Sequence, residues 1–401
     1  MSHTLLINIT GPESRGLIAA VTQAVAGHEL SMEKLDQSVY HDTLLFSAQL
    51  SVPAQETAAS VVEKLCALCD EHQLTCSSEI SVAGSELTKY AVTLLSQEVT
   101  EEQVVRVNQV LAEHGAIITG AKDLTNDGAL NPENAKKRIS SCLEFQAKAI
   151  SLDTDQLKKA LLEASTELTM DVVVQQESVY RRHRRLAVFD MDSTLIKAEV
   201  IDLLADEAGI GHKVAEITER AMRGELDFNE SFRERLAMLK GLDESVLAGI
   251  ADNLIIMDGA ERLISSLNKL GYTTAILSGG FTYFAEYLQN RLGIDHIYAN
   301  ELEIVDGKVT GVAKGTIVNA ERKAELLNQL TKDEGIELDQ TIAIGDGAND
   351  LLMLAEAGLG VAFHAKPLVR QKANYSVSTL GLDSALYLLG LSEKEIRALH
   401  G

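Results

Sequence analysis

The stretch Leu186-Ala-Val-Phe-Asp-Met-Asp-Ser-Thr-Leu195 sets the architecture of the C-terminal half of the chain. Its apolar start, Leu186 to Phe189, predicts a short buried strand that ends directly in Asp190 and Asp192. Carboxylates are rarely buried unless they are paired or bind a metal. At the carboxyl end of a strand in an open α/β sheet, they would point into the crevice where such folds bind ligands. Read alone, the stretch also fits an Asp-rich surface turn.

A second acidic motif, Ile344-Gly-Asp-Gly-Ala-Asn-Asp350, ends another apolar run. A carboxylate nucleophile and a phosphate repel each other across ~3 Å unless a cation neutralises them. Oxygen ligands from Asp190, Asp346 and the backbone carbonyl of Asp192 suit Mg²⁺, which binds few carboxylates and keeps several waters. We therefore expect Mg²⁺ where these two runs end, although this motif alone would also fit a surface turn.

Two further positions complete a phosphate site. The run Ile276-Leu-Ser-Gly-Gly280 ends a strand with a hydroxyl and two glycines, so Ser278 and the N–H of Gly279 can approach a phosphate closely. Lys323, in a helical stretch, can supply a positive charge, although a single lysine is usually a solvated surface residue. The order Asp-x-Asp, Ser, Lys, Asp-x-x-x-Asp indicates Mg²⁺-assisted phosphoryl transfer.

The C-terminal region, residues 181–401, is predicted to be an α/β domain with a parallel sheet. Its apolar runs Thr273–Leu277, Thr341–Ile344 and Gly360–Phe363 each follow a helical segment. The pattern between residues 199 and 257 is helical only, which predicts a helical cap inserted after the first strand. Such a cap can exclude water from the strand ends.

The N-terminal region contains one pattern twice. Residues 1–84 and 85–180 each have the order strand, helix, strand, strand, helix, strand, which predicts two ferredoxin-like domains. The basic run Tyr180-Arg-Arg-His-Arg-Arg185 then marks the final domain boundary, and we expect it to be a solvated face or linker.

From Arg185 to Ser378 the chain resembles the haloacid-dehalogenase superfamily, and within it the phosphoserine phosphatases. The motifs around Asp190, Ser278, Lys323 and Asp346 match the family in order and spacing. Glu199 and the cap segment Met222-Arg-Gly-Glu-Leu-Asp-Phe-Asn-Glu-Ser-Phe-Arg-Glu-Arg235 match the subfamily. The resemblance implies a Rossmann-like fold and a phosphoric monoester hydrolase that converts O-phosphoserine to serine in the last step of serine biosynthesis.

The resemblance also implies roles for individual residues. Asp190 would be the nucleophile that forms an aspartyl-phosphate, and Asp192 the acid and base. Glu199 and Arg235 would bind the amino and carboxylate groups of serine, because a zwitterion pairs with one anion and one planar cation. The remaining positions would form the pocket wall, the phosphate contacts and the outer support, namely Met222, Phe228, Ser278, Gly279, Lys323, Asn349 and Asp350.

The two N-terminal units resemble ACT domains, the amino-acid-sensing modules of metabolic enzymes. The strand–loop–helix entrance Gly11-Pro-Glu-Ser-Arg-Gly-Leu-Ile18 matches the family, and free N–H groups at a helix N-terminus suit an amino-acid carboxylate. The second copy has Ser96-Gln-Glu-Val-Thr100 there, without glycine, which favours a structural role. The resemblance implies a serine effector and a homodimer.

Composition limits the other functions that we weighed. A net charge of −23 argues against nucleic-acid binding, and no apolar run reaches the ~20 residues of a membrane span. Four cysteines and an N-terminus without a signal-peptide pattern lead us to expect a cytoplasmic protein. Cys66, Cys69, His72 and Cys76 have a spacing that resembles a zinc site, but helical periodicity favours a core role.

Two alternatives remain open from the sequence. The first is a related phosphatase or phosphotransferase that uses another small phosphomonoester. The second is an amino-acid-sensing regulatory protein in which the phosphatase domain is secondary.

Overall fold

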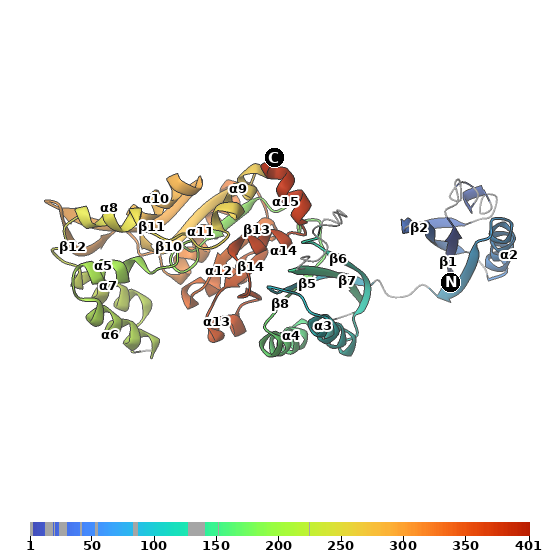
Figure 1. Ribbon diagram of the computed structural model, residues 1–401, viewed down its shortest axis with the longest axis horizontal. Helices are drawn as coiled ribbons and strands as arrows, with labels where there is room; N and C mark the ends of the chain where they lie inside the picture. Colours follow the sequence, from blue (N-terminus) through green and yellow to red (C-terminus); the bar gives the residue numbers. More distant parts are fainter. Residues whose placement is uncertain are drawn as a thin grey trace, which may run out of the picture. The chain divides into compact units, whose positions relative to one another are not determined.

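The computed structural model divides into two compact units, Met1–Glu86 and Leu87–Gly401 (Figure 1). It describes residues 3–12, 19, 21–23, 30–40, 42–52, 55–82, 87–126, 141–150, 152–223 and 225–401. Within these ranges every helix is too short or too polar to cross a membrane.

The first unit contains a four-stranded antiparallel sheet with the order β2-β3-β1-β4. Its described elements are β1 (His3–Pro12), β2 (Ser31–Tyr40), β3 (Thr43–Val52), α2 (Gln55–Glu71) and β4 (Thr75–Val82). Alternate residues of β1, Leu5, Ile7 and Ile9, are buried in one core with residues of α2. The first helix of the predicted order lies mostly outside the described residues.

The second unit begins with another antiparallel sheet of the same topology, in the order β6-β7-β5-β8. Its elements are β5 (Thr88–Leu95), α3 (Glu101–Glu113), β6 (Ile117–Asp123), β7 (Cys142–Ala149), α4 (Thr154–Leu168) and β8 (Asp171–Gln176). Thr100 starts α3 because its hydroxyl accepts from the N–H of Gln103, whose side chain bonds back to Thr100. The ferredoxin-like arrangement is confirmed for both sheets, and we call this one the second ferredoxin-like sheet.

The C-terminal region is built on a seven-stranded sheet with the order β12-β11-β10-β9-β13-β14-β15. Its strands are β9 (Leu186–Phe189), β10 (Thr273–Phe281), β11 (His296–Val305), β12 (Lys308–Lys314), β13 (Thr341–Gly345), β14 (Leu359–Phe363) and β15 (Tyr375–Val377). All neighbours are parallel except β11 and β12, an antiparallel pair at the edge. The expected α/β fold is therefore confirmed, with β9 at its centre.

Helices cover both faces of this sheet, as Figure 1 shows. Leu186 and Val188 of β9 share a core with the helices α11 (Ala320–Asp333), α12 (Leu351–Glu356) and α13 (Pro367–Lys372). Ala187 and Phe189 face the opposite core, with α9 (Ala260–Lys269), α10 (Thr282–Leu292), α14 (Ala385–Leu388) and α15 (Glu393–His400). Because both faces are buried, β9 is apolar at every position, and only its end is polar.

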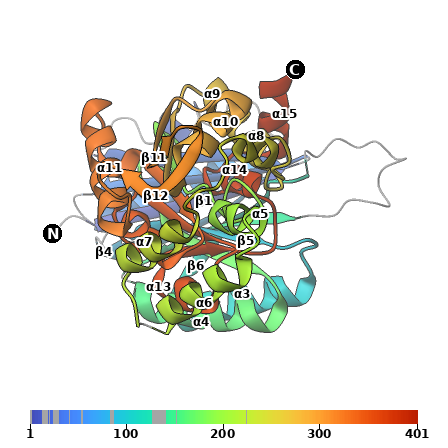
Figure 2. The ribbon, with the colours of Figure 1, turned by 90° about the vertical axis from the view of Figure 1, so that its left-hand side faces the viewer.

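Four helices form the cap predicted between the first and second parallel strands. They are α5 (Val200–Glu207), α6 (Gly211–Met222), α7 (Phe228–Met238) and α8 (Ser245–Asp252). Figure 2 shows α5, α6 and α7 at the end of the unit that faces the viewer. The loop between α7 and α8 is hydrogen-bonded to the β11–β12 hairpin, since Gly241 N donates to Val309 O at 2.8 Å.

The prediction that the run from Tyr180 to Arg185 is a solvated face or linker is wrong for two of its arginines, whereas Arg182, His183 and Arg185 are exposed. Arg181 is only 2% exposed and Arg184 only 5%. Arg181 pairs with Glu144, which is also buried, and with Glu177. Arg181 and Arg184 are buried because the second ferredoxin-like sheet packs against the C-terminal region. Three residues of that sheet and its loops lie in the hydrophobic core of the C-terminal region, namely Leu124, Cys142 and Val173.

Candidate active site

Three neighbouring parallel strands, β10, β9 and β13, place the first site residues together. Phe189 of β9 is in register with Ile276 of β10 on one side and with Ile344 of β13 on the other. Asp190 directly follows Phe189, and its N–H donates to Ile344 O at 2.9 Å. Ser278 and Asp346 each lie two residues beyond their registered neighbour, so the three side chains belong to one edge of the sheet.

Lys323 joins the two acidic motifs. It lies on α11, is fully buried, and places its Nζ 2.8 Å from Asp190 Oδ1 and 2.6 Å from Asp350 Oδ1. Burial alone disfavours the ammonium, but the charges of Asp190 and Asp350 raise the pKa of Lys323. The lysine is therefore charged at neutral pH. It is a buried part of the candidate site and not a solvated surface residue.

The carboxylates of Asp190, Asp346 and Asp350 form an acidic cluster, in which one oxygen of each lies within 4.8 Å of the others. Burial, followed by the charges of Asp190 and Asp350, raises the pKa of Asp346 to about 8. One lysine does not balance three carboxylates, two of them buried and one half-buried, so the cluster favours a further cation. Oxygen donors of this kind fit a hard divalent ion such as Mg²⁺.

Asp192 lies against the glycine pair that follows Ser278. Its Oδ1 accepts from the N–H of Val200, the first residue of cap helix α5, at 3.1 Å. Its Oδ2 is so close to Gly280 that a Cβ there would lie 2.6 Å away. Burial, followed by the charges of Glu199 and Asp190, raises the pKa of Asp192 well above its usual range. A protonated carboxyl at this position can donate a proton.

The Ser278–Gly280 segment of β10 is held by an asparagine that sequence reasoning missed. Ser278 Oγ accepts from the N–H of Gly280 at 2.9 Å. Asn300, 1% exposed, donates to Gly279 O at 2.8 Å and accepts from Val318 N at 2.9 Å. It thereby ties this part of β10 to the segment that leads into α11 and Lys323. Its only sequence signal is its place directly after the apolar run Ile297-Tyr-Ala299.

The second acidic motif wraps tightly around Asp350. Gly347 N donates to Asp350 Oδ2 at 2.9 Å, and a Cβ on Gly345 would lie 2.4 Å from Asp350 Cγ. Asn349 is half-buried beside Gly347 in the 3₁₀ turn η3 (Ala348–Asp350). Thr194, from the first motif, donates its hydroxyl proton to Asp346 Oδ1 at 3.2 Å. The two motifs are thus joined directly.

The cap places opposite charges near the acidic cluster. Ser193, with φ of +55°, donates to Glu199 Oε1 at 2.9 Å. Burial of the carboxyl group raises the pKa of Glu199, and the nearby charge of Asp190 raises it further. The hydrogen bond from Ser193 opposes this shift. Arg235 on α7 has a buried Nε without a hydrogen-bond partner in the described structure. Burial lowers the pKa of Arg235, and the charges of Asp202 and Glu199 oppose this effect.

The apolar wall is described for one of its two predicted residues. The ring of Phe228 lies against Gly279, where a Cβ would be 3.0 Å from Phe228 Cζ. It stacks on Phe232 with 6.3 Å between ring centroids, so its position is fixed by the cap core. The side chain of Met222 lies outside the described residues.

A cavity of about 690 Å³ lies between α7, β12 and the start of α11. Its lining includes Phe232 and Asn319 but none of the predicted site residues. We therefore place the candidate site at the strand ends, where the acidic cluster and Lys323 meet, and not in this cavity.

The zinc reading of the cysteine group gains no support. Cys69 is buried in the core of the first unit, and Cys66 and Cys76 are half-buried. All are free thiols, and burial raises the pKa of Cys69 and that of Cys76, the latter to about 12. Among the described residues, the acidic cluster is the group arranged to hold a metal.

Comparisons with known proteins identify the family of the chain. The profile of the haloacid dehalogenase-like hydrolases matches residues 187–355, and an ACT domain profile matches residues 3–79. The phosphoserine phosphatase of Streptomyces coelicolor is 36% identical over 98% of this chain and 94% of its own. The phosphoserine phosphatase SerB2 of Mycobacterium tuberculosis is 35% identical over 98% of this chain and 95% of its own.

Two solved structures are similar over most of their length. A haloacid dehalogenase family hydrolase from Salmonella enterica serovar Typhi has a TM-score of 0.62 and 28% identity, covering 75% of this chain and 98% of its own. A probable phosphoserine phosphatase from Vibrio cholerae has a TM-score of 0.58 and 34% identity, covering 78% and 88%. The chain therefore belongs to the phosphoserine phosphatase family of haloacid dehalogenase-like hydrolases.

Proposed function

We propose that the chain hydrolyses O-phosphoserine to serine and phosphate, the last step of serine biosynthesis. The observation that carries the proposal is that two features occur together in one site. Lys323 contacts Asp190 at 2.8 Å, and the cap supplies the opposite charges of Glu199 and Arg235. The first suits phosphoryl transfer, and the second suits a substrate that has both an ammonium and a carboxylate.

Asp190 is the proposed nucleophile. A carboxylate oxygen attacks phosphorus as the bond from phosphorus to the serine oxygen breaks, giving an aspartyl-phosphate. Asp192, whose pKa is raised by burial, would give a proton to the leaving serine oxygen. It then takes a proton from the water that attacks the aspartyl-phosphate, and phosphate leaves with the Asp190 carboxylate restored.

The chain's own residues would hold the phosphate and a Mg²⁺ ion. Ser278, Gly279, Lys323 and Asn349 would contact phosphate oxygens, and the carboxylates of Asp190 and Asp346 with the Asp192 carbonyl would bind the ion. Asp350 would orient Lys323, to which it is hydrogen-bonded at 2.6 Å. When bound, Mg²⁺ would neutralise part of the phosphate charge so that an anionic nucleophile can approach.

The cap would select the substrate. Glu199 would pair with the ammonium of phosphoserine and Arg235 with its carboxylate, while Met222 and Phe228 would wall the pocket. The unpartnered, buried Nε of Arg235 supports this role, because a buried donor without a partner is costly unless a ligand satisfies it.

The N-terminal half would regulate and assemble the enzyme. We propose ACT-like domains at residues 1–84 and 85–180, the phosphatase domain at 181–401 with its cap at about 199–257, and a cytoplasmic homodimer. Serine would bind the first ACT-like domain as an effector. Calorimetric titration of serine into the full chain tests this idea, and absence of heat beyond active-site binding would reject it.

Phosphate release from phosphoserine tests the main proposal. Asp190→Asn should abolish release, and Mg²⁺ should restore activity to wild-type protein treated with a chelator. Asp155→Asn, an exposed change on α4, is the matched control. Turnover by Asp190→Asn at the wild-type rate would remove Asp190 as nucleophile, and faster turnover of another phosphomonoester would reassign the substrate.

A further inference from the structure

Two linkers join the cap to the core and run side by side. Lys197 N donates to Ile255 O at 2.9 Å, and Met257 N donates to Leu195 O at 2.8 Å. An antiparallel bridge pairs Ile196 with Ile256 between these bonds. Closure of a cap over a site is absorbed by a few residues at such connections. Whatever holds these linkers in place therefore sets the position of the cap.

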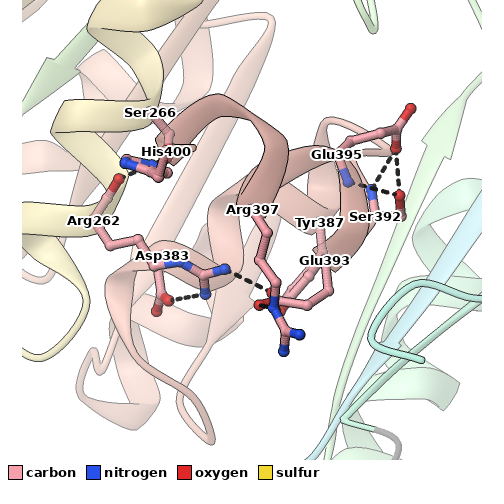
Figure 3. Close-up of polar contacts among 9 residues, drawn as sticks. All are labelled: Arg262, Ser266, Asp383, Tyr387, Ser392, Glu393, Glu395, Arg397 and His400. Atoms are coloured by element: carbon pink, nitrogen blue, oxygen red, sulfur yellow. Dashed lines mark hydrogen bonds and ion pairs between the residues drawn. The ribbon is translucent and has the colours of Figure 1, made fainter. Parts of the chain in front are cut away.

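The second linker is held by the segment Ser378–Asp383, which we call the connector. Leu382 N donates to the carbonyl of Asp258, at the end of the linker, at 2.7 Å. Asp383 lies against the next residue, Gly259, where a Cβ would be 2.2 Å from Asp383 Oδ1. Arg262 Nη1 binds Asp383 Oδ2 at 2.9 Å (Figure 3). One end of the connector is thus fixed to the cap linker.

The other end of the connector is held by the second ferredoxin-like sheet. Asp171, the first residue of β8, is 1% exposed. Its Oδ2 accepts from Ser378 N at 2.7 Å, Thr379 N at 2.8 Å and Thr379 Oγ1 at 2.8 Å. Hydrogen bonds from N–H groups to a buried carboxylate are among the strong ones in proteins.

A second contact links the second ferredoxin-like sheet to α9, the helix that carries Arg262. Arg262 Nη2 binds Glu393 Oε2 at 2.6 Å, as Figure 3 shows. Glu393 N donates to Leu124 O at 2.7 Å, and Leu124 directly follows β6 of the second ferredoxin-like sheet. Arg262 therefore binds two carboxylates whose segments are both anchored to that sheet.

We propose that Asp171 is a positioning residue for the cap and acts through the connector on Asp258. Thr379 and Leu382 are three positions apart, so little slack separates the contact with Asp171 from the contact with the linker. A short segment fixed at both ends passes a displacement at one end to the other. The second ferredoxin-like sheet thus sets how far the cap opens over Asp190. This inference goes beyond the proposed reaction and does not depend on it.

Hydrogen–deuterium exchange in the full chain, without substrate, tests the inference. Asp171→Asn removes the charge that binds Ser378 and Thr379, and Asp155→Asn is the matched exposed control. In Asp171→Asn we expect exchange about tenfold faster at Lys197 and Met257, the amides that pair the two linkers. Exchange at Val188, inside β9, should stay unchanged.

Thr379→Val, which keeps the side-chain shape and removes one hydrogen bond to Asp171, serves as a milder second variant. It should give the same pattern with a smaller increase. Faster exchange at Ser378 and Thr379 with unchanged rates at Lys197 and Met257 would overturn the inference. So would a uniform increase that includes Val188, because it would mean global destabilisation.

Discussion

Lys323 Nζ lies 2.8 Å from Asp190 Oδ1, and neither side chain is more than 7% exposed. Replacing Lys323 with Met would leave Asp190 and Asp350 buried without a cation. We expect the free energy of unfolding to fall by about 3–5 kcal/mol, the usual cost of removing one partner of a buried pair. We also expect kcat to fall at least about hundredfold, because a charge that stabilises the transition state is lost.

Urea unfolding and steady-state kinetics measure both effects. Lys332→Met, an exposed change on the same helix, is the control. A variant that lost stability but kept its kcat would show that Lys323 is structural only.

Gly280 leaves no room for a side chain, since a Cβ there would lie 2.6 Å from both Asp192 Oδ2 and Met191 Cε. Gly280→Ala should displace Asp192 and lower kcat by about tenfold or more, while overpacking costs about 1–3 kcal/mol of stability. Gly249→Ala on α8, where no atom lies within 4 Å, is the matched control. Kinetics and thermal unfolding decide the matter, and an unchanged kcat would contradict the assigned role of Asp192.

Replacing Arg235 should weaken substrate binding more than it slows the chemical step. Arg235→Met should raise KM for phosphoserine about hundredfold, because a charged group that binds a carboxylate is lost. KM for phosphoethanolamine, which lacks the carboxylate, should change little. Arg233→Met, exposed on the same helix, controls for helix effects. Equal losses for both substrates would contradict the carboxylate contact.

Glu393 should make the free energy of unfolding depend on pH in the acidic range. Burial would raise the pKa of Glu393, but hydrogen bonds from Arg262, Arg397 and Tyr387 lower it below the ordinary 4.5. A lowered pKa in the folded state means that the stabilisation is complete above 4.5 and is lost as the pH falls through the folded value. The free energy of unfolding of wild type should exceed that of Glu393→Gln by about 2 kcal/mol at neutral pH.

Urea unfolding at pH 7 and at several lower values would measure this difference. It should shrink as the pH falls below 4.5, whereas Glu286→Gln, an exposed change on α10, should show no such trend. A difference that stayed constant with pH would mean that the Glu393 charge is not what stabilises the C-terminal helix.

The strand ends could be predicted from the sequence because their pattern is local. Four apolar residues before Asp190, or a strand that ends in Ser278 and two glycines, are visible in a few positions. The expected strand Thr273–Leu277 nonetheless runs on to Phe281, since the backbone continues past an irregularity in its pairing with β11. The β11–β12 hairpin was not predicted.

Other features depend on residues that are distant in the sequence. The burial of Arg181 requires Glu144, which lies 37 positions earlier, and no local pattern reveals such a partner. Asn300 matters because its two hydrogen bonds reach Gly279 and Val318, 21 and 18 positions away. Polar residues of this kind look like ordinary surface residues until the fold brings their partners together.

The bridge between Ile196 and Ile256 means that the chain leaves and re-enters the core at a single point. Everything between these residues is an insertion whose two ends are already adjacent. A different set of helices could be grafted at that point as a cassette, leaving β9 and its neighbours in register. The proposed reacting groups follow the strands of the sheet, and most of the proposed recognition groups belong to the insertion, so new substrates could evolve without rebuilding the chemistry.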